Sequence, residues 1–373
     1  MQAFEMIHTK FGFGCMRLPM KGNEVDIEET TKMVDYFLEH GFNYFDTAHG
    51  YINGLSEKAI KTCLTSRYAR DQYLLTDKLT DVYFKSEAEI RPLFESQLEA
   101  CGVDYFDFYL MHAQNETNFA KFKKCRAYET AFALKEEGKI KHVGISFHDK
   151  AKVLDQILTE YPEIEIVQIQ LNYLDWESAS VESRKCYEVC VKHDKPVIVM
   201  EPVKGGSLVN LPEKAQAALD ELHGGSNASY AIRFAAGFDH VRVVLSGMSN
   251  FEQMQDNVSY MKDFKPLNEE EKQAIEKVCA AFNDLNIIPC TSCRYCIEEN
   301  HCPMNILIPS LFSTYNTKKM FHTWNADYYY NNVLILSNGK ASDCIKCGMC
   351  EHVCPQQLPI RKYLEEVANE FEH

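Results

Sequence analysis

The sequence is poor in the features that mark a protein of nucleic acids or membranes. Acidic residues outnumber basic ones, with 54 Asp and Glu against 39 Lys and Arg and a net charge of −15. Because nucleic acids and anionic lipid surfaces attract basic proteins, we expect neither as a partner. No stretch approaches the roughly 18 uninterrupted apolar residues of a transmembrane helix. The opening residues, MQAFEMIHTKFGFG, lack the basic and then apolar pattern of a signal peptide, so we expect a cytoplasmic protein.

The glycine fingerprint of dinucleotide-binding folds is also missing. No Gly-x-Gly-x-x-Gly follows the first predicted strand, where the sequence FGFGCM (11–16) has only two glycines. This disfavours a doubly wound sheet, although that fold remains the structural alternative. With 373 residues, 46% of them hydrophobic, the chain has the length of a large barrel or of two domains.

Residues 1 to about 262 alternate short β-rich runs with amphipathic helical stretches. Helical patterns such as 87–102 place apolar residues on one side and end at Gly102. Strict alternation predicts parallel strands joined by crossovers, and eight such units fit a closed (β/α)8 TIM barrel better than an open sheet. The eight expected strands are 12–18, 43–48, 73–78, 106–112, 142–147, 166–172, 196–202 and 241–247.

Eight of the 15 cysteines form two similar runs near the C-terminus. They read Cys290-x2-Cys293-x2-Cys296-x5-Cys302-Pro303 and Cys344-x2-Cys347-x2-Cys350-x3-Cys354-Pro355. Three closely spaced thiolates can hold one face of a cubane iron–sulfur cluster, so the pattern predicts two 4Fe–4S clusters. Zinc is the alternative, but four-coordinate zinc needs only two Cys-x2-Cys pairs, and without a secretory signal a disulfide framework is disfavoured further. The remaining cysteines are scattered and are expected to be buried and reduced: Cys15, Cys63, Cys101, Cys125, Cys186, Cys190 and Cys279.

The second cysteine run resembles the bacterial two-cluster ferredoxins, whereas the first has two more residues before its last cysteine. That resemblance implies that the fourth ligand of each cluster comes from the other run. One cluster would then be held by Cys290, Cys293, Cys296 and Cys354, and the other by Cys344, Cys347, Cys350 and Cys302. We therefore expect a barrel domain over residues 1–286 and a ferredoxin-like domain over 287–373.

Four polar residues with complementary chemistry follow three neighbouring predicted strands. Asp46 ends the second strand and Tyr51 follows it, Lys78 ends the third strand, and His112 ends the fourth. Side chains at the C-terminal ends of barrel strands face the active site. A tyrosine, with a solution pKa of about 10, is a poor acid unless a cation stabilises its phenolate. Lys78 can do that, Asp46 can hold Lys78, and His112 can orient a substrate oxygen. Each residue alone also fits a structural role.

The segments FDTAHGY (45–51), LLTDK (74–78) and YLMH (109–112) resemble the aldo-keto reductase family. Gly54-x-Ser56-Glu57 is similar to that family as well, and the likeness extends over roughly residues 8–262. With the cysteine region attached, the chain resembles the ferredoxin-tailed branch of the family. The resemblance implies interconversion of a small aldehyde or ketone and an alcohol with NAD(P)H, in which Tyr51 is the general acid.

The same resemblance implies where the coenzyme binds. Ser146 and Gln168 match the residues that hold the nicotinamide carboxamide, and Met200 stands where many members stack an aromatic ring. Phe147 replaces a common Asn. The phosphates are expected beside a helix start after the eighth strand, which suits phosphate binding. The candidates are Ser246, Gly247, Met248, Gln253 and Asn257, with Lys204 as a nearby cation. Since no basic pair stands at these positions, the choice between NAD and NADP is open.

The two halves carry different electron chemistry, because hydride transfer moves two electrons and a cubane cluster moves one. We favour a carbonyl reductase whose clusters pass electrons to a ferredoxin or another redox partner, or shape a C-terminal lid. The second hypothesis is a ferredoxin-type electron-transfer protein that uses the barrel as a docking scaffold. A third gives the clusters a purely structural role, since a tail with little core of its own needs metal to fold.

Overall fold

The computed structural model describes residues 4–178, 181–222, 224–285, 287–298, 302–321 and 325–372. These residues form two compact units. The first comprises the chain up to Pro202 together with Ala228–Leu267, and the second comprises Val203–Asn227 together with Asn268–His373. The domain boundary that the sequence suggests at residue 286 stays a prediction.

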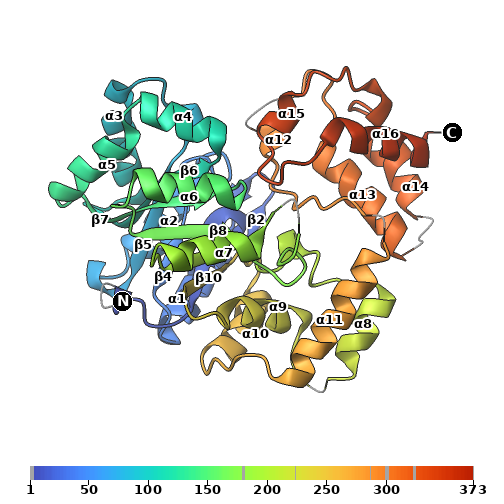
Figure 1. Ribbon diagram of the computed structural model, residues 1–373, viewed down its shortest axis with the longest axis horizontal. Coiled ribbons are helices and arrows are strands. Elements are labelled where there is room, and N and C mark those ends of the chain that lie inside the picture. Colours follow the sequence, from blue (N-terminus) through green and yellow to red (C-terminus); the bar gives the residue numbers. More distant parts are fainter. Residues whose placement is uncertain are drawn as a thin grey trace. The chain divides into compact units, whose positions relative to one another are not determined.

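The first unit is built around a closed barrel of eight strands among the described residues (Figure 1). All neighbouring strands are parallel, and β1 closes the ring by pairing with both β4 and β10. The predicted (β/α)8 barrel is therefore confirmed. Its strands are β1 (Phe11–Gly14), β4 (Tyr44–Asp46), β5 (Leu74–Leu79), β6 (Phe106–Gln114), β7 (Ile140–Phe147), β8 (Ile166–Gln170), β9 (Val197–Met200) and β10 (Val241–Ser246).

The strands are apolar on both faces, as parallel strands covered by helices must be. One layer of the barrel interior is a buried cluster of Tyr44, Leu74, Phe108, Leu110, Ile166, Ile198, Val243 and Leu245. Since Tyr44, Leu74 and Ile166 begin their strands, this layer lies toward the amino ends, and Phe4 packs against it. The interior is therefore filled there, and the polar side chains are left to the opposite ends.

Helices surround the strands in Figure 1. The α3 helix ends at Gly102, whose φ of 67° is the left-handed conformation expected for a glycine stop. Asn250 caps α10 by accepting a hydrogen bond from the Gln253 backbone. The helices of this unit are α1 (Ile27–Glu39), α2 (Leu55–Ile60), α3 (Glu87–Cys101), α4 (Glu116–Lys124), α5 (Ala127–Glu136), α6 (Ala151–Glu160), α7 (Ser183–Lys192), α9 (Asn227–Ala236) and α10 (Phe251–Met261). A short antiparallel hairpin joins β2 (Met20–Lys21) and β3 (Glu24–Val25).

The second unit is helical and has a hydrophobic core of its own. That core includes Leu311, Phe312, Leu364 and Phe371, so the expectation of a tail with little core was wrong. Asn268 starts α11 with a capping box. The helices are α8 (Glu213–Asp220), α11 (Glu269–Asn283), α12 (Tyr295–Glu298), α13 (Ile308–Phe321), α14 (Asn325–Tyr329), α15 (Met349–His352) and α16 (Ile360–Phe371).

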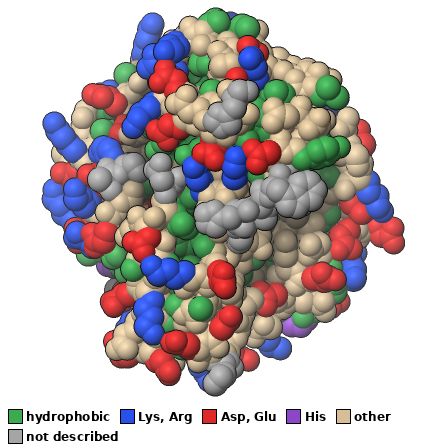
Figure 2. Space-filling view, turned by 90° about the vertical axis from the view of Figure 1, so that its right-hand side faces the viewer, with side chains coloured by type: hydrophobic (Ala, Val, Ile, Leu, Met, Phe, Trp, Pro, Cys, Tyr) green, Lys and Arg blue, Asp and Glu red, His purple; other side chains and the backbone are tan. Residues whose placement is uncertain are grey.

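The described surface carries both signs of charge. Figure 2 shows acidic and basic side chains interspersed over the face that it draws, with apolar side chains between them. Among the described residues, no helix has both the length and the apolar character needed to cross a membrane.

Candidate active site

The four polar residues at the ends of β4, β5 and β6 meet around the Lys78 ammonium group. Lys78 Nζ donates to Asp46 Oδ1 at 2.6 Å, to the Thr47 carbonyl oxygen at 2.7 Å and to Tyr51 Oη at 3.2 Å. The Tyr51 and His112 rings meet edge to face, with their centroids 6.0 Å apart. The structure thus brings together all four residues that the sequence singled out.

Lys78 is a buried cation whose partners compensate for lost hydration. Its side chain has no exposed surface, and the Asp46 side chain is 4% exposed. Burial raises the pKa of Asp46, while the Lys78 ammonium and the Gln168 amide oppose that rise. Three hydrogen bonds use the three donors of the ammonium, and one of them leads to the phenol of Tyr51. The phenol therefore faces a fixed positive charge.

The surroundings of His112 favour its uncharged form. Its Nδ1 shares a hydrogen bond with Thr80 Oγ1 at 2.7 Å. Burial lowers the pKa of His112 well below its usual value, and the charge of Lys78 lowers it further. In an uncharged imidazole the two ring nitrogens have different roles, one as hydrogen-bond donor and the other as acceptor, and the bond to Thr80 decides which role the second nitrogen takes.

The residues expected at the nicotinamide lie on neighbouring strands. Ser146 pairs in register with Gln168, and Gln170 pairs with Met200 at the end of β9. Ser146 Oγ accepts a hydrogen bond from the Ala113 backbone at 2.8 Å. Gln168 Nε2 donates to Asp46 Oδ2 at 3.2 Å, a bond that the sequence did not suggest. Gln168 is therefore part of the charge network of Lys78.

Most residues expected at the coenzyme phosphates lie together where β10 leads into α10. Asn257 Nδ2 donates to Ser246 Oγ at 2.8 Å, and Gln253 Oε1 accepts from the Ser249 backbone at 2.8 Å. Gly247 is exposed, whereas Met248 is 1% exposed. Lys204, the remaining candidate, begins a short 3-10 segment (Lys204–Gly206) of the second unit and is buried.

An arginine that the sequence reading missed lies at the same end of the barrel. A Cβ placed on Gly247 would lie 3.4 Å from the Arg17 side chain, and Ser249 Oγ donates to the Arg17 carbonyl oxygen at 2.9 Å. Because β1 pairs with β10, residues that follow these two strands are neighbours. The pairing of first and last strands in a closed barrel could have pointed to this arginine.

The two cysteine runs of the second unit have the same local backbone. The second residue after the leading cysteine has positive φ in both runs, with Ser292 at 53° and Lys346 at 58°. The fourth residue also has positive φ, with Arg294 at 71° and Gly348 at 78°. The two loops therefore share their left-handed positions.

The Cys-Pro segments have matched backbones too. Asn305 N–H donates to the Cys302 carbonyl oxygen at 2.8 Å, and Gln357 N–H donates to the Cys354 carbonyl oxygen at 3.0 Å. The described parts of the two runs thus share these turns, although the last intervals of the runs differ by two residues in the sequence.

One of the crossed sets that the ferredoxin resemblance implied lines a single pocket. Four cysteines from both runs line one pocket with about 370 Å³ of empty space: Cys302, Cys344, Cys347 and Cys350. Burial raises the pKa of Cys350 to about 12, and Glu351 and these neighbouring cysteines contribute to the rise. Burial also raises the pKa of Cys296, where Cys290 and Cys354 are the next contributors. The pocket therefore combines thiols of the second run with the Cys-Pro cysteine of the first, and Cys296 has Cys350 as well as Cys290 and Cys354 near it.

Comparison with known proteins decides the family. The model of the aldo/keto reductase family matches residues 10–280. The chain belongs to the aldo/keto reductase family. A second model, the 4Fe-4S dicluster domain, matches residues 289–359. This aldo/keto reductase therefore carries a C-terminal iron–sulfur domain.

Its relatives share the barrel at modest identity. The uncharacterized oxidoreductase YqkF of Bacillus subtilis is 24% identical over 301 residues, which cover 72% of this chain and 92% of that protein. The 9,11-endoperoxide prostaglandin H2 reductase of Trypanosoma cruzi is 24% identical over 269 residues, covering 70% and 88%. The chain is thus similar to oxidoreductases over its barrel region.

Solved structures of aldo-keto reductases are similar to this chain over the barrel region. The holo form of an aldo-keto reductase from Bacillus halodurans has 26% identity and a TM-score of 0.59, covering 72% of this chain and 91% of that one. A Klebsiella pneumoniae aldo-keto reductase in complex with NADPH has 19% identity and a TM-score of 0.58, covering 72% and 90%. The second likeness supports the fold alone.

The thiol sets fit the group that the second family model implies. A cubane cluster needs four thiolates around one space, and the pocket of Cys302, Cys344, Cys347 and Cys350 provides that arrangement. Cys350 lies in the short helix α15, and Lys346 and Gly348 on either side of Cys347 have positive φ.

Two further polar residues of the barrel mouth escaped the sequence reading. Thr80 bonds His112, and His148 follows the end of β7. Burial, together with a smaller effect of the Lys78 charge, lowers the pKa of His148 to about 4. Both residues lie just beyond a strand, where only the rule that strand ends face the active site would have found them.

Proposed function

We propose that this aldo/keto reductase interconverts an aldehyde or ketone and an alcohol with NAD(P)H at the site of Asp46, Tyr51, Lys78 and His112. The observation that carries the proposal is the hydrogen bond from the buried Lys78 ammonium to Tyr51 Oη, with Asp46 as its counter-ion. The bound coenzyme would supply or accept the hydride.

In the direction of reduction, Tyr51 gives its phenolic proton to the carbonyl oxygen as that oxygen gains negative charge. The phenolate that remains lies 3.2 Å from Lys78 Nζ, which stabilises it. Asp46 keeps the ammonium charged and oriented through its 2.6 Å contact. Lys78 and Asp46 therefore lower the free-energy barrier for proton transfer from Tyr51, because the negative charge left on the phenol is stabilised within the site.

His112 fixes the substrate oxygen beside Tyr51. The Thr80 hydroxyl and Nδ1 share a hydrogen bond. In the tautomer that this mechanism uses, the hydroxyl donates to Nδ1, and the second ring nitrogen carries the proton that would be donated to the carbonyl oxygen. Because the pKa of His112 is lowered, it acts by hydrogen bonding and leaves proton donation to Tyr51.

For the coenzyme, Ser146, Gln168 and Met200 would face the nicotinamide, and Ser246, Gly247, Met248, Gln253 and Asn257 would face the phosphates. Arg17 adds a cation beside Gly247, and Lys204 stays a second candidate cation. A single arginine and no basic pair support use of both NAD and NADP with little discrimination.

The C-terminal domain would hold two 4Fe–4S clusters, one on Cys290, Cys293, Cys296 and Cys354 and the other on Cys302, Cys344, Cys347 and Cys350. When bound, such clusters supply one-electron transfer and folding energy. Cys347 is exposed, and so are Met304, Ile345 and Met349, which line the same pocket. An accessible cluster with an apolar rim supports electron exchange with a ferredoxin or another redox partner.

The second candidate function is a ferredoxin-type electron-transfer protein with an inactive barrel. The same exposed Cys347 pocket favours it, but a scaffold has no need of a complete Lys78 network. We would reconstitute the clusters under anaerobic conditions and measure NAD(P)H oxidation with a panel of aldehydes and ketones. Reduction of a carbonyl without any added electron acceptor supports the first function. Clusters that exchange electrons with ferredoxin or viologen, with NAD(P)H not oxidised by any carbonyl, support the second.

A further inference from the structure

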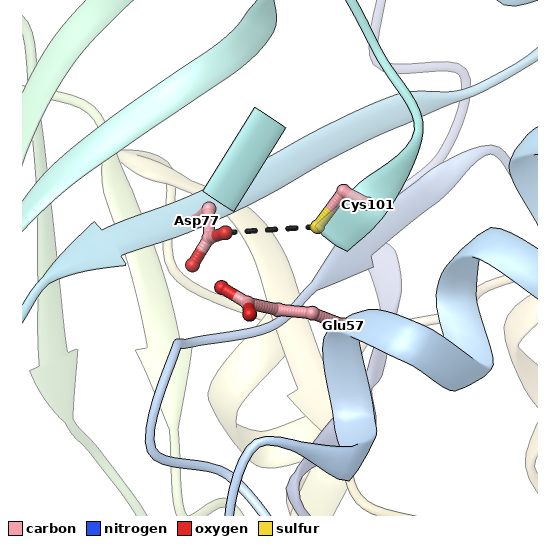
Figure 3. Close-up of side chains that lie close together, drawn as sticks. All are labelled: Glu57, Asp77 and Cys101. Atoms are coloured by element: carbon pink, nitrogen blue, oxygen red, sulfur yellow. Dashed lines mark hydrogen bonds between the residues drawn. The ribbon is translucent and has the colours of Figure 1, made fainter. Parts of the chain in front are cut away.

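The outer side of β5 carries a second buried polar network that the proposed mechanism does not use. Asp77 of β5, Glu57 of α2 and Cys101 of α3 face one another between strand and helices (Figure 3). Their ligand atoms lie within 4.8 Å of one another, and the residues are 0%, 1% and 0% exposed. Asp77 therefore lies on the opposite side of the strand from the Lys78 side chain.

Each carboxyl group has hydrogen-bond partners. Asp77 Oδ1 accepts from the Lys78 backbone N–H at 2.7 Å, and Asp77 Oδ2 accepts from Cys101 Sγ at 3.7 Å. The two oxygens of Glu57 lie 3.1 and 3.0 Å from His49 Nδ1.

Two carboxylates this close in a dry environment cannot both be ionised. Burial raises the pKa of Asp77 well above its usual value, and the charge of Glu57 is the next cause. Burial and the nearby charge thus both favour the protonated form of Asp77. The titratable groups around the pair are His49, Cys101, Tyr109 and Lys78, whose ammonium points instead to Asp46.

The pair supports the backbone of Lys78 where the barrel does not. The strand β4 pairs with β5 only as far as Thr76. The N–H of Leu74 and the carbonyl oxygen of Thr76 form hydrogen bonds toward the β4 side of the strand. Because backbone groups alternate in direction along a strand, the N–H and carbonyl oxygen of Lys78 point to the same side, beyond the last residue that pairs with β4. Asp77 takes the Lys78 N–H, and Gln97 Nε2 donates to the Lys78 carbonyl oxygen at 3.0 Å.

The other half of the pair is tied to Tyr51. His49 stands two residues before Tyr51, and Glu57 lies in the first turn of α2, which follows the same loop. That loop contains the left-handed residues Ile52, Asn53 and Gly54. The contact between His49 and Glu57 therefore joins the two ends of the loop that carries Tyr51.

We propose that Glu57 and Asp77 are positioning residues that share one proton and hold the Tyr51 loop against the strand of Lys78. The inference rests on the proposed function of these two catalytic residues. Without the shared proton the two carboxylates would repel, and the 3.2 Å contact between Tyr51 Oη and Lys78 Nζ would loosen.

Four variants test this: Asp77→Asn, Glu57→Gln, Asp77→Leu and, as a matched control, Glu137→Gln on the exposed surface. Asn and Gln can form the same hydrogen bonds through an amide that carries neither a charge nor a titratable proton. Both variants should therefore retain a kcat close to that of the wild type. Leu removes the acceptor of the Lys78 N–H, and kcat should fall by about tenfold to a hundredfold, with the Kd of NAD(P)H unchanged. The carbonyl stretching band of a protonated carboxylic acid, measured by infrared spectroscopy, should be present in wild type and Glu137→Gln. It should be lost in Asp77→Asn and in Glu57→Gln.

A wild-type spectrum without that band, or a band that survives in Asp77→Asn, contradicts the shared proton. A folded Asp77→Leu enzyme with normal kcat contradicts the positioning role. If Asp77→Leu does not fold, the infrared comparison of Asp77→Asn with wild type still decides. The spectra do not depend on turnover, so failure of the proposed reaction, seen as an active Tyr51→Phe variant, is a separate result.

Discussion

The charged side chain of Lys78 has no exposed surface. Its burial is possible because neighbouring groups form hydrogen bonds with the ammonium. Asp46, the Thr47 carbonyl oxygen and Tyr51 take its three protons. A buried ion pair loses much when one partner is removed, because the other charge is left without compensation. The same residue therefore bears on both stability and the proposed proton transfer.

Lys78→Met should lower kcat by about a hundredfold to ten-thousandfold, since the phenolate of Tyr51 loses its cation. The free energy of unfolding should fall by about 3–5 kcal/mol as Asp46 is left unpaired. Steady-state kinetics and denaturant unfolding measure the two effects. Lys192→Met, at an exposed lysine paired with Asp155, is the control and should change neither. Normal turnover by Lys78→Met would contradict the proposed role.

Arg17 is the second residue with a local consequence. If it contacts a coenzyme phosphate, Arg17→Leu loses a charged hydrogen bond of about 1.5–3 kcal/mol, which corresponds to a Kd for NAD(P)H raised by about tenfold to a hundredfold. Fluorescence titration measures this, and added salt should weaken wild type more than the variant. Arg91→Leu, at an exposed arginine paired with Glu137, should bind normally. Equal affinities of Arg17→Leu and wild type would remove Arg17 from the site.

At the scale of elements, the barrel could be predicted because its strands are continuous apolar runs separated by amphipathic helices. Asp46, Lys78 and His112 could be found because each stands at the C-terminal end of such a run. Thr80 and His148 lie just past the ends of their strands and carry no pattern of their own. The support of Lys78 by Gln97 depends on how α3 packs over β5, which no local pattern reports.

The cysteine loops could be predicted from spacing alone, because three thiols at fixed intervals leave few geometries. Their equivalence despite different last intervals needed the backbone, with Ser292 and Lys346 in the same left-handed conformation. Each loop and its crossed Cys-Pro partner should therefore act as one unit of metal binding.

Cys347→Ser should lose one cluster and keep the other, because its loop partners Cys344 and Cys350 serve the same pocket. Anaerobically purified wild type should hold about eight irons per chain, and the variant about four. Iron analysis and paramagnetic resonance measure this, with Cys279→Ser on α11 as a matched control that keeps both clusters. One or two tightly bound zinc atoms per chain would contradict the assignment.

At the scale of the whole molecule, the described residues form two compact units, and the second has its own core. The first unit keeps two buried histidines near Lys78, His112 and His148, both with lowered pKa. In the unfolded chain these histidines take up protons below about pH 6.5, whereas the folded barrel resists protonation. Stability is therefore fully present above that pH and is lost as pH falls.

The contribution of His148 to the pH dependence of the free energy of unfolding should appear between about pH 6.5 and its folded pKa of about 4. In that window, wild type should lose up to about 1.4 kcal/mol per pH unit more than His148→Gln does. Denaturant unfolding at a series of pH values gives both slopes. The carboxyl groups are the same in both proteins, so their contributions to the slopes cancel in the comparison. Equal slopes would mean that His148 is protonated in the folded barrel.

The most direct test of the account is carbonyl reduction by Tyr51→Phe, on a substrate that the wild type turns over. The substitution removes the phenolic proton and keeps the ring that packs against His112. We predict that kcat falls by about a hundredfold to ten-thousandfold, while the Kd of NAD(P)H stays at the wild-type value. A Tyr51→Phe enzyme that reduces the carbonyl at the wild-type rate would contradict the proposed mechanism and favour the electron-transfer function.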